Sequence, residues 1–159
     1  MNKSKQMLIS WLRDAHAMER ASVDTLDRLA ERLSRFPALS AQFREHWRIS
    51  QNQVTDIEVC LKKLSSDTST FKDLATRFFG IAQSYAVAMV PDEVVKDCLA
   101  AYAYRNFEIA AYLSLGAAAL VVEEPDVARM CEEHIQQERA MAGWLEKQIP
   151  EVTLEFLRP

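Results

Sequence analysis

The stretch YAYRNFEIAAY, residues 102–112, has the apolar spacing of a buried helix but carries an arginine and a glutamate on the buried face. Apolar residues recur every three or four positions on both sides of its centre, at Val94, Cys98, Ala101, Tyr112, Leu115 and Ala119. The same spacing places Arg105 and Glu108 on that face. Burying an unpaired charge costs on the order of several kcal/mol, so the two residues predict a polar site inside a helical protein.

Composition favours one all-α domain that spans residues 1–159. Apolar residues make up 49% of the chain and charged residues 26%, as in ordinary globular proteins. Three glycines and five prolines are too few for the many turns of a β protein, so we expect long helices. The net charge of -4, without a long basic run, argues against nucleic-acid binding.

Cysteine usage and hydropathy predict a cytoplasmic protein that does not span a membrane. Cys60, Cys98 and Cys131 are odd in number and lack CxxC spacing, which indicates buried free thiols in a reducing compartment. Arg13 and Asp14 interrupt the N-terminal apolar residues, so the segment does not resemble a signal peptide. No apolar run reaches the roughly 18 residues of a membrane span.

The periodicity predicts four long helices, over roughly 5–34, 38–65, 92–122 and 126–148, and a shorter helix over 71–88. Pro150 is expected to end the last helix, which leaves a tail that can dock on the bundle through Val152, Leu154 and Leu157. Short links make the first two and the last two long helices antiparallel hairpins. Two hairpins joined by one long crossover predict a ferritin-like four-helix bundle with an extra helix in the crossover.

Every long helix replaces apolar residues with polar ones near its own midpoint. The residues, in chain order, are Glu19, His46, Ser50, Gln53, Arg105, Glu108, His134 and Glu138. Midpoints of antiparallel helices meet at the same height, so these side chains should form one internal polar layer. Carboxylates and imidazoles from four helices can hold a pair of iron or manganese ions. Alternatively, an arginine can compensate the carboxylates.

At these residues the chain resembles the YciE/YciF group of ferritin-like bacterial proteins over about residues 8–157. The stretches that carry the resemblance are WLRDAHAMER (11–20), VVKDCLAAYAYRNFEIAAY (94–112), CEEHIQQERAMAGWL (131–145) and PEVTLEFL (150–157). The resemblance implies a ferritin-like bundle, usually a dimer, with a carboxylate-rich site between the helices. It also implies an association with bacterial stress responses, without a defined biochemical activity.

The chain departs from the group's pattern in most of the acidic positions. Acids typical of the group are replaced at 48, 49, 105 and 137, whereas Glu19, Glu108 and Glu138 remain. We therefore expect a polar layer that stands in place of metal and includes Arg105, Arg48, His46 and Gln137. If iron or manganese is bound instead, the expected ligands are Glu19, Glu108, Glu138 and His134.

Three functional interpretations follow. The favoured one is a ferritin-like protein without a working di-metal centre or catalytic residues, in a structural, interaction or stress-related role. The second is a metal-binding oxidoreductase of the di-iron type, or a storage protein, with the reduced ligand set. The third is a plain helical bundle that serves as a partner in a complex. A homodimer is expected because the crossover is rich in apolar residues, at Phe78, Phe79, Ile81, Tyr85 and Met89.

Overall fold

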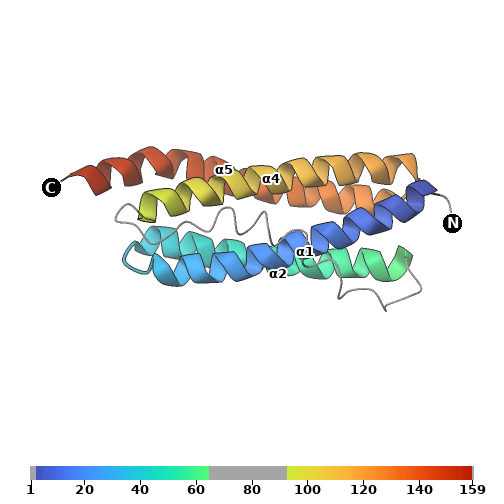
Figure 1. The fold of residues 1–159 in the computed structure, drawn as a ribbon, viewed down its shortest axis with the longest axis horizontal. Coiled ribbons are helices and arrows are strands. Elements are labelled where there is room, and N and C mark those ends of the chain that lie inside the picture. Colours follow the sequence, from blue (N-terminus) through green and yellow to red (C-terminus); the bar gives the residue numbers. More distant parts are fainter. Residues whose placement is uncertain (1–2, 65–92, 159) are drawn as a thin grey trace.

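The computed structural model describes residues 3–64 and 93–158, and these ranges fold into four long α-helices (Figure 1). The helices are α1 (Lys3–Arg32), α2 (Pro37–Leu64), α4 (Glu93–Val121) and α5 (Pro125–Leu157). The predicted all-α, ferritin-like bundle is confirmed. The helix predicted over 71–88 and the apolar residues of the crossover lie outside the described residues.

The four helices pair as the link lengths predicted. α1 packs along α2 and α4 packs along α5, whereas the contacts of α1 with α4 and of α2 with α5 are less extensive. Figure 1 shows the two hairpins lying one above the other, with their helices nearly parallel to the long axis of the molecule. All four helix midpoints therefore lie near the middle of the bundle.

Short turns with defined chemistry close both hairpins. Pro37 begins α2, where a missing backbone N–H costs nothing, and the Ser40 hydroxyl donates to the Ala30 carbonyl over 2.7 Å. At the end of α4, Glu123 adopts a left-handed backbone conformation with a φ of 59°. The Glu124 N–H then bonds the Ala119 carbonyl over 2.9 Å, as in a Schellman motif.

The expectation that Pro150 ends the last helix is wrong, because α5 continues through it to Leu157. Proline lacks the N–H that would bond the Glu146 carbonyl, so it removes one helical hydrogen bond without ending the helix; three residues later the Thr153 hydroxyl donates to the Ile149 carbonyl over 2.7 Å. Val152 is buried, which anchors the segment on the bundle. Leu154 and Leu157, expected to dock with it, are exposed instead.

Two apolar clusters fill the bundle, one toward each end. One cluster is centred on Leu8, Leu12, Ile57, Leu61 and Leu115. The other is centred on Leu26, Leu29, Phe43, Met141 and Leu145. Polar side chains therefore occupy the middle of the molecule, between two halves that are held together by ordinary apolar packing.

The cysteines and the hydropathy of the helices agree with the sequence expectations. Cys60, Cys98 and Cys131 are buried free thiols. Within residues 3–64 and 93–158, no helix has the length and the apolar character that crossing a membrane requires.

Candidate functional site

A layer of buried polar side chains crosses the bundle between the two apolar clusters. All four described helices contribute to it, and every member is at least about nine-tenths buried: Glu19, Ser22, His46, Ser50, Gln53, Arg105, Glu108, His134 and Glu138. The spacing on each helix is three or four residues, so one face supplies its members. The arrangement is the internal polar layer that the sequence predicted.

Arg105 lies at the centre of the layer. Its Nε is 3.1 Å from Glu108 Oε2 and its Nη1 is 3.3 Å from Glu138 Oε2. Neither contact has hydrogen-bond geometry, so both are ion-pair contacts. The aligned hydrogen bond runs from Nη2 to the Ser22 hydroxyl over 2.7 Å. One guanidinium thus joins α4 to α5 and α1 inside the bundle.

Glu138 is the best-compensated carboxylate of the layer. His46 Nε2 lies 3.0 Å from its Oε2, and the Gln53 amide donates to its Oε1 over 2.8 Å. Burial acts to raise the pKa of Glu138, but the charge of Arg105 and the hydrogen bond from His46 outweigh it and lower the pKa to about 2. Burial also lowers the pKa of His46, so this imidazole is neutral and donates. Glu138 therefore carries the negative charge that balances Arg105.

Glu19 and Glu108 differ from Glu138 because burial raises their pKa by more than Arg105 and the nearby hydrogen-bond donors lower it. Burial and the nearby charge of Glu138 raise the pKa of Glu19 to about 8, although the Tyr112 hydroxyl donates to its Oε1 over 2.6 Å. Burial likewise raises the pKa of Glu108 well above its ordinary value, despite the Arg105 contact. At neutral pH the layer is close to electrically balanced, with two protonated acids beside one ion pair.

His134 connects the layer to the surface. Its Nε2 lies 3.2 Å from the exposed Asp56 carboxylate, and its ring meets the Tyr112 ring edge-on at 4.9 Å between centroids. Burial lowers the pKa of His134, with Asp56 opposing, so the imidazole is neutral and places its proton on Nε2. Its Nδ1 is a buried acceptor without a hydrogen-bond partner among the described residues.

Two of the predicted members lie outside the layer. The expectation that Arg48 contributes to it is wrong: its side chain is 64% exposed and pairs with Glu45, one turn away. Arg48 is two residues from His46, so it points to the opposite side of α2. Gln137 lies at the edge, where it is exposed and accepts a hydrogen bond from Gln53 over 2.9 Å. Position 49 carries Ile49, which is also outside the buried set.

Sequence reasoning missed three partners in the layer. The sequence pattern places Tyr112 on an apolar stripe and does not single out Ser22, yet their hydroxyls contact Glu19 and Arg105. Asp56 was not singled out, yet it bonds His134. Tyr112 follows Glu108 by four positions, so its hydroxyl lies one helical turn from a buried charged residue. That spacing was the signal in the sequence for a polar role of Tyr112.

The side chains of the layer do not fit a dinuclear metal centre. Such a centre in this fold takes four carboxylates and two histidines from the four helices. Here Glu19, Glu108 and Glu138 supply three carboxylates, and the Arg105 guanidinium lies against two of them. A fixed positive charge in that place repels a cation and fills its space. Among the described residues, no three His, Cys, Asp or Glu side chains are grouped so that they can hold a metal ion.

Solved structures with the same architecture include three bacterial proteins. A protein from Xanthomonas campestris pv. campestris is 31% identical, with a TM-score of 0.82 over 98% of this chain and 97% of its own. The Escherichia coli stress protein YciF is 19% identical, with a TM-score of 0.82 over 96% and 98% of the two chains. YcfI, a proposed structural protein from Rhodopseudomonas palustris, is 21% identical, with a TM-score of 0.78 over 92% and 94%.

The resemblance to the YciE/YciF group is thereby confirmed, both in fold and in the extent of the chain that matches. A family model described as a domain of unknown function matches residues 3–158, which is nearly the full length. The chain therefore belongs to the DUF892 family of ferritin-like helical proteins.

Proposed function

We propose that this protein is a ferritin-like bundle in which a buried arginine–carboxylate network takes the place of a di-metal centre. Its role is then structural or interactive, in a bacterial stress response, and not redox catalysis. The network holds the middle of four long helices together without a cofactor. The position of Arg105 between Glu108 and Glu138 is the observation that carries this proposal.

The printed descriptions of two similar proteins support the physiological part of the proposal. YciF is described as a stress protein and YcfI as a proposed structural protein. Both are less than 25% identical to this chain, so they support its fold directly and its role only by analogy.

Location and partners belong to the same proposal. Three buried free thiols suit the reducing cytoplasm. The net charge of -4 does not favour nucleic acid, so the expected partners are proteins, above all a second copy of the chain in a homodimer.

Metal analysis of the purified protein tests the proposal. We expect substoichiometric iron and manganese by inductively coupled plasma mass spectrometry, and no saturable heat when Mn²⁺ is titrated into the protein. The variant Arg105→Glu adds a fourth carboxylate and removes the fixed cation, so its melting temperature should rise when Mn²⁺ is added. Tight stoichiometric metal in the unmodified protein would overturn the proposal.

A second candidate function rests on unpartnered acceptors in the layer. Glu19 Oε2 and Nδ1 of His134 are buried and lack hydrogen-bond partners among the described residues. With Glu108 and Glu138, these two residues would supply the reduced ligand set for iron or manganese in an oxidoreductase or storage protein. Arg105 opposes it, and the substitution Glu19→Gln distinguishes the two: loss of bound metal would favour this alternative.

A further inference from the structure

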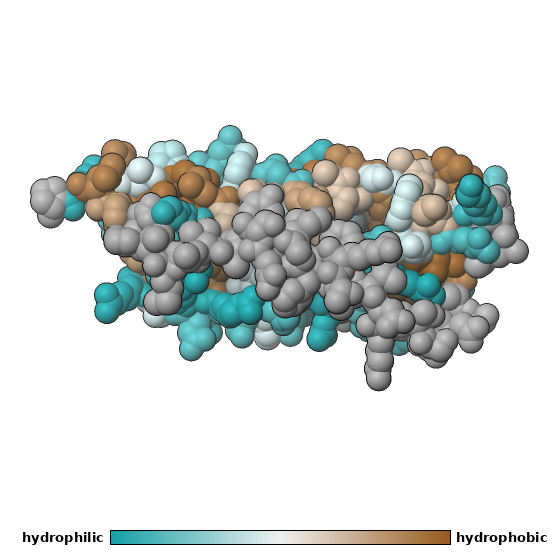
Figure 2. Space-filling view, viewed as in Figure 1, coloured by the Kyte–Doolittle hydropathy of each residue, from teal (hydrophilic) through white to brown (hydrophobic). Residues whose placement is uncertain are grey.

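The C-terminal segment of α5, residues 150–157, projects from the bundle with apolar side chains exposed. Val152 packs into the core, whereas Leu154, Phe156 and Leu157 are 55%, 43% and 69% exposed. Figure 1 shows this end of α5 extending beyond the start of α4, and Figure 2 shows hydrophobic side chains gathered there. Single exposed apolar residues are ordinary, but three within four positions on a projecting helix indicate a contact surface.

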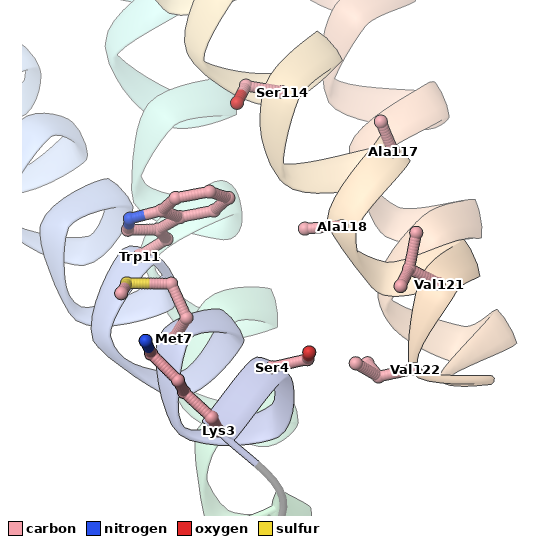
Figure 3. A pocket seen from close by; sticks show the side chains of 9 residues that line it. All are labelled: Lys3, Ser4, Met7, Trp11, Ser114, Ala117, Ala118, Val121 and Val122. Carbon is pink, nitrogen blue, oxygen red and sulfur yellow. The ribbon is translucent and has the colours of Figure 1, made fainter.

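An apolar groove lies at the opposite end of the bundle, between the first turns of α1 and the last turns of α4 (Figure 3). It has a volume of about 520 Å³, and Lys3 supplies a positive charge beside it. Its apolar lining includes Met7, Trp11, Ala118, Val121 and Val122. Figure 3 shows Trp11 and Met7 one turn apart on α1, with the Trp11 ring extending toward α4, and Ala118, Val121 and Val122 on the other side of the groove.

The C-terminal segment and the groove agree in length and in charge. The groove is lined by residues between 3 and 11 and between 114 and 122, about 12 Å of helix on each side. The segment is also about 12 Å long at 1.5 Å per residue. It carries exposed Glu151 and Glu155, opposite in sign to Lys3. Leu154 and Leu157 lie one turn apart on the face opposite buried Val152, the spacing with which a helix places two apolar side chains in a groove.

The segment cannot reach the groove of its own chain. The two features lie at opposite ends of helices such as α1, whose 30 residues span about 45 Å. We propose that the C-terminal segment of one protomer docks as a helix in the α1–α4 groove of a second copy. This builds on the homodimer of the proposed function but does not depend on whether the polar layer holds metal.

A two-fold axis across the bundle makes the contact twice. Two copies side by side and antiparallel place each C-terminal segment beside the other's groove, so the assembly closes at two chains. Each contact buries apolar residues that are exposed in the single chain, among them Val121, which is 77% exposed. The segment and the groove are then two halves of one isologous interface.

Sedimentation velocity on three single variants of the full chain tests the contact. Leu157→Glu charges the segment and Val121→Glu charges the groove, at positions where the exposed side chain makes folding defects small. Leu99→Glu is the matched control, because Leu99 is 48% exposed on α4 outside both features. We expect the unmodified chain to have twice the mass of 18.2 kDa at tens of micromolar. Each test variant should raise the dimer dissociation constant at least about tenfold, and the control less than about twofold.

Mixing variants of opposite charge adds a readout that general destabilisation cannot imitate. A mixture of Val121→Lys with Leu157→Glu forms one unmodified contact and one contact in which Lys faces Glu, so it should dimerise more tightly than either variant alone. A monomeric unmodified chain would overturn the homodimer itself. A dimer that both variants leave intact, or a mixture without gain, would overturn this contact while leaving the homodimer standing. An open series of larger oligomers would overturn the two-fold arrangement.

Discussion

Arg105 and Arg32 each contact two carboxylates, but water reaches the guanidinium of Arg32 and not that of Arg105. Arg32, on α1, lies 2.9 Å from both Glu93 and Asp97 of α4, and its side chain is 38% exposed. The Arg105 side chain is 3% exposed, with carboxylates at 3.1 and 3.3 Å. Asp97 is itself buried, so the contrast lies in the two guanidinium groups: that of Arg32 is partly solvated near one end of the bundle, and that of Arg105 is desolvated in its middle.

The difference shows how burial changes the way charge is compensated. Where solvent screens the ions, pairing contributes little and its loss is tolerated. In the buried layer one guanidinium faces three carboxylates, and protons on Glu19 and Glu108 supply the remaining compensation. Removing the central cation should therefore cost much more in the layer than at Arg32.

Arg105→Ala is expected to produce the largest effect of any change in this comparison. It leaves ionised Glu138 buried without its cation, which should lower the free energy of unfolding by about 3–5 kcal/mol. Urea denaturation at pH 7 measures the change. The double variant Arg105→Met with Glu138→Gln removes both charges and should recover at least half of the loss. A loss below about 1 kcal/mol for Arg105→Ala would place this residue in the same class as Arg32.

Glu19 should make the stability of the protein fall as pH rises above 5. Its pKa is raised from 4.5 to about 8 in the folded protein, so the folded state binds the proton more tightly than the unfolded state. The resulting stabilisation is full below pH 4.5 and is lost as pH rises toward 8, by a few kcal/mol in all. Glu19→Gln mimics the neutral acid, so its unfolding free energy should change less over this range.

Denaturation curves at pH 3, 4, 5, 6, 7 and 8 compare Glu19→Gln with the unmodified protein. Glu138→Gln is the control of opposite sign, because the Glu138 pKa is lowered to about 2. Its ionised form stabilises the fold above pH 4.5, and that stabilisation is lost as pH falls toward 2. Equal slopes between pH 5 and 8 for Glu19→Gln and the unmodified protein would contradict the assignment of a buried proton to Glu19.

Tyr112→Phe should have an intermediate effect. It removes the hydroxyl that donates to Glu19, at a cost of about 1–2 kcal/mol for a buried acceptor left without a donor. Because this hydrogen bond lowers the pKa of Glu19, its loss should also move the pH-dependent fall to higher pH. Tyr104→Phe is the matched control: its hydroxyl donates to the Met18 carbonyl, so the pH dependence should stay unchanged.

Arg32→Ala should have the smallest effect, about 1 kcal/mol, because the Arg32 side chain is 38% exposed and its removal opens buried Asp97 and the 25% exposed Glu93 to water. The loss should shrink further when thermal melts are recorded in 0.5 M instead of 0.05 M NaCl. Arg48→Ala is the control at a fully surface pair with Glu45 and should leave the melting temperature unchanged. A salt-insensitive loss of several kcal/mol at Arg32 would remove the contrast with Arg105.

Much of the layer was predictable because its members obey helical periodicity. Glu19, Glu108, Glu138 and Arg105 lie on stripes that apolar neighbours define, so the sequence placed them inside. Arg48 was wrongly included because the YciE/YciF group typically has an acidic residue at this position. Arg48 is two positions from His46, so helical periodicity predicts that it points away from the layer, and periodicity was the better guide.

The sequence by itself determined the four helices, their pairing into hairpins and the height of the polar layer, since these depend on local spacing and link length. Only the tertiary structure decided how the layer divides its charge. Glu138 is ionised and Glu19 is protonated because their distances from Arg105, His46 and Tyr112 differ, and those distances arise between helices. The continuation of α5 through Pro150 was decided in the same way, by the burial of Val152 against the bundle, which outweighs the local preference of proline.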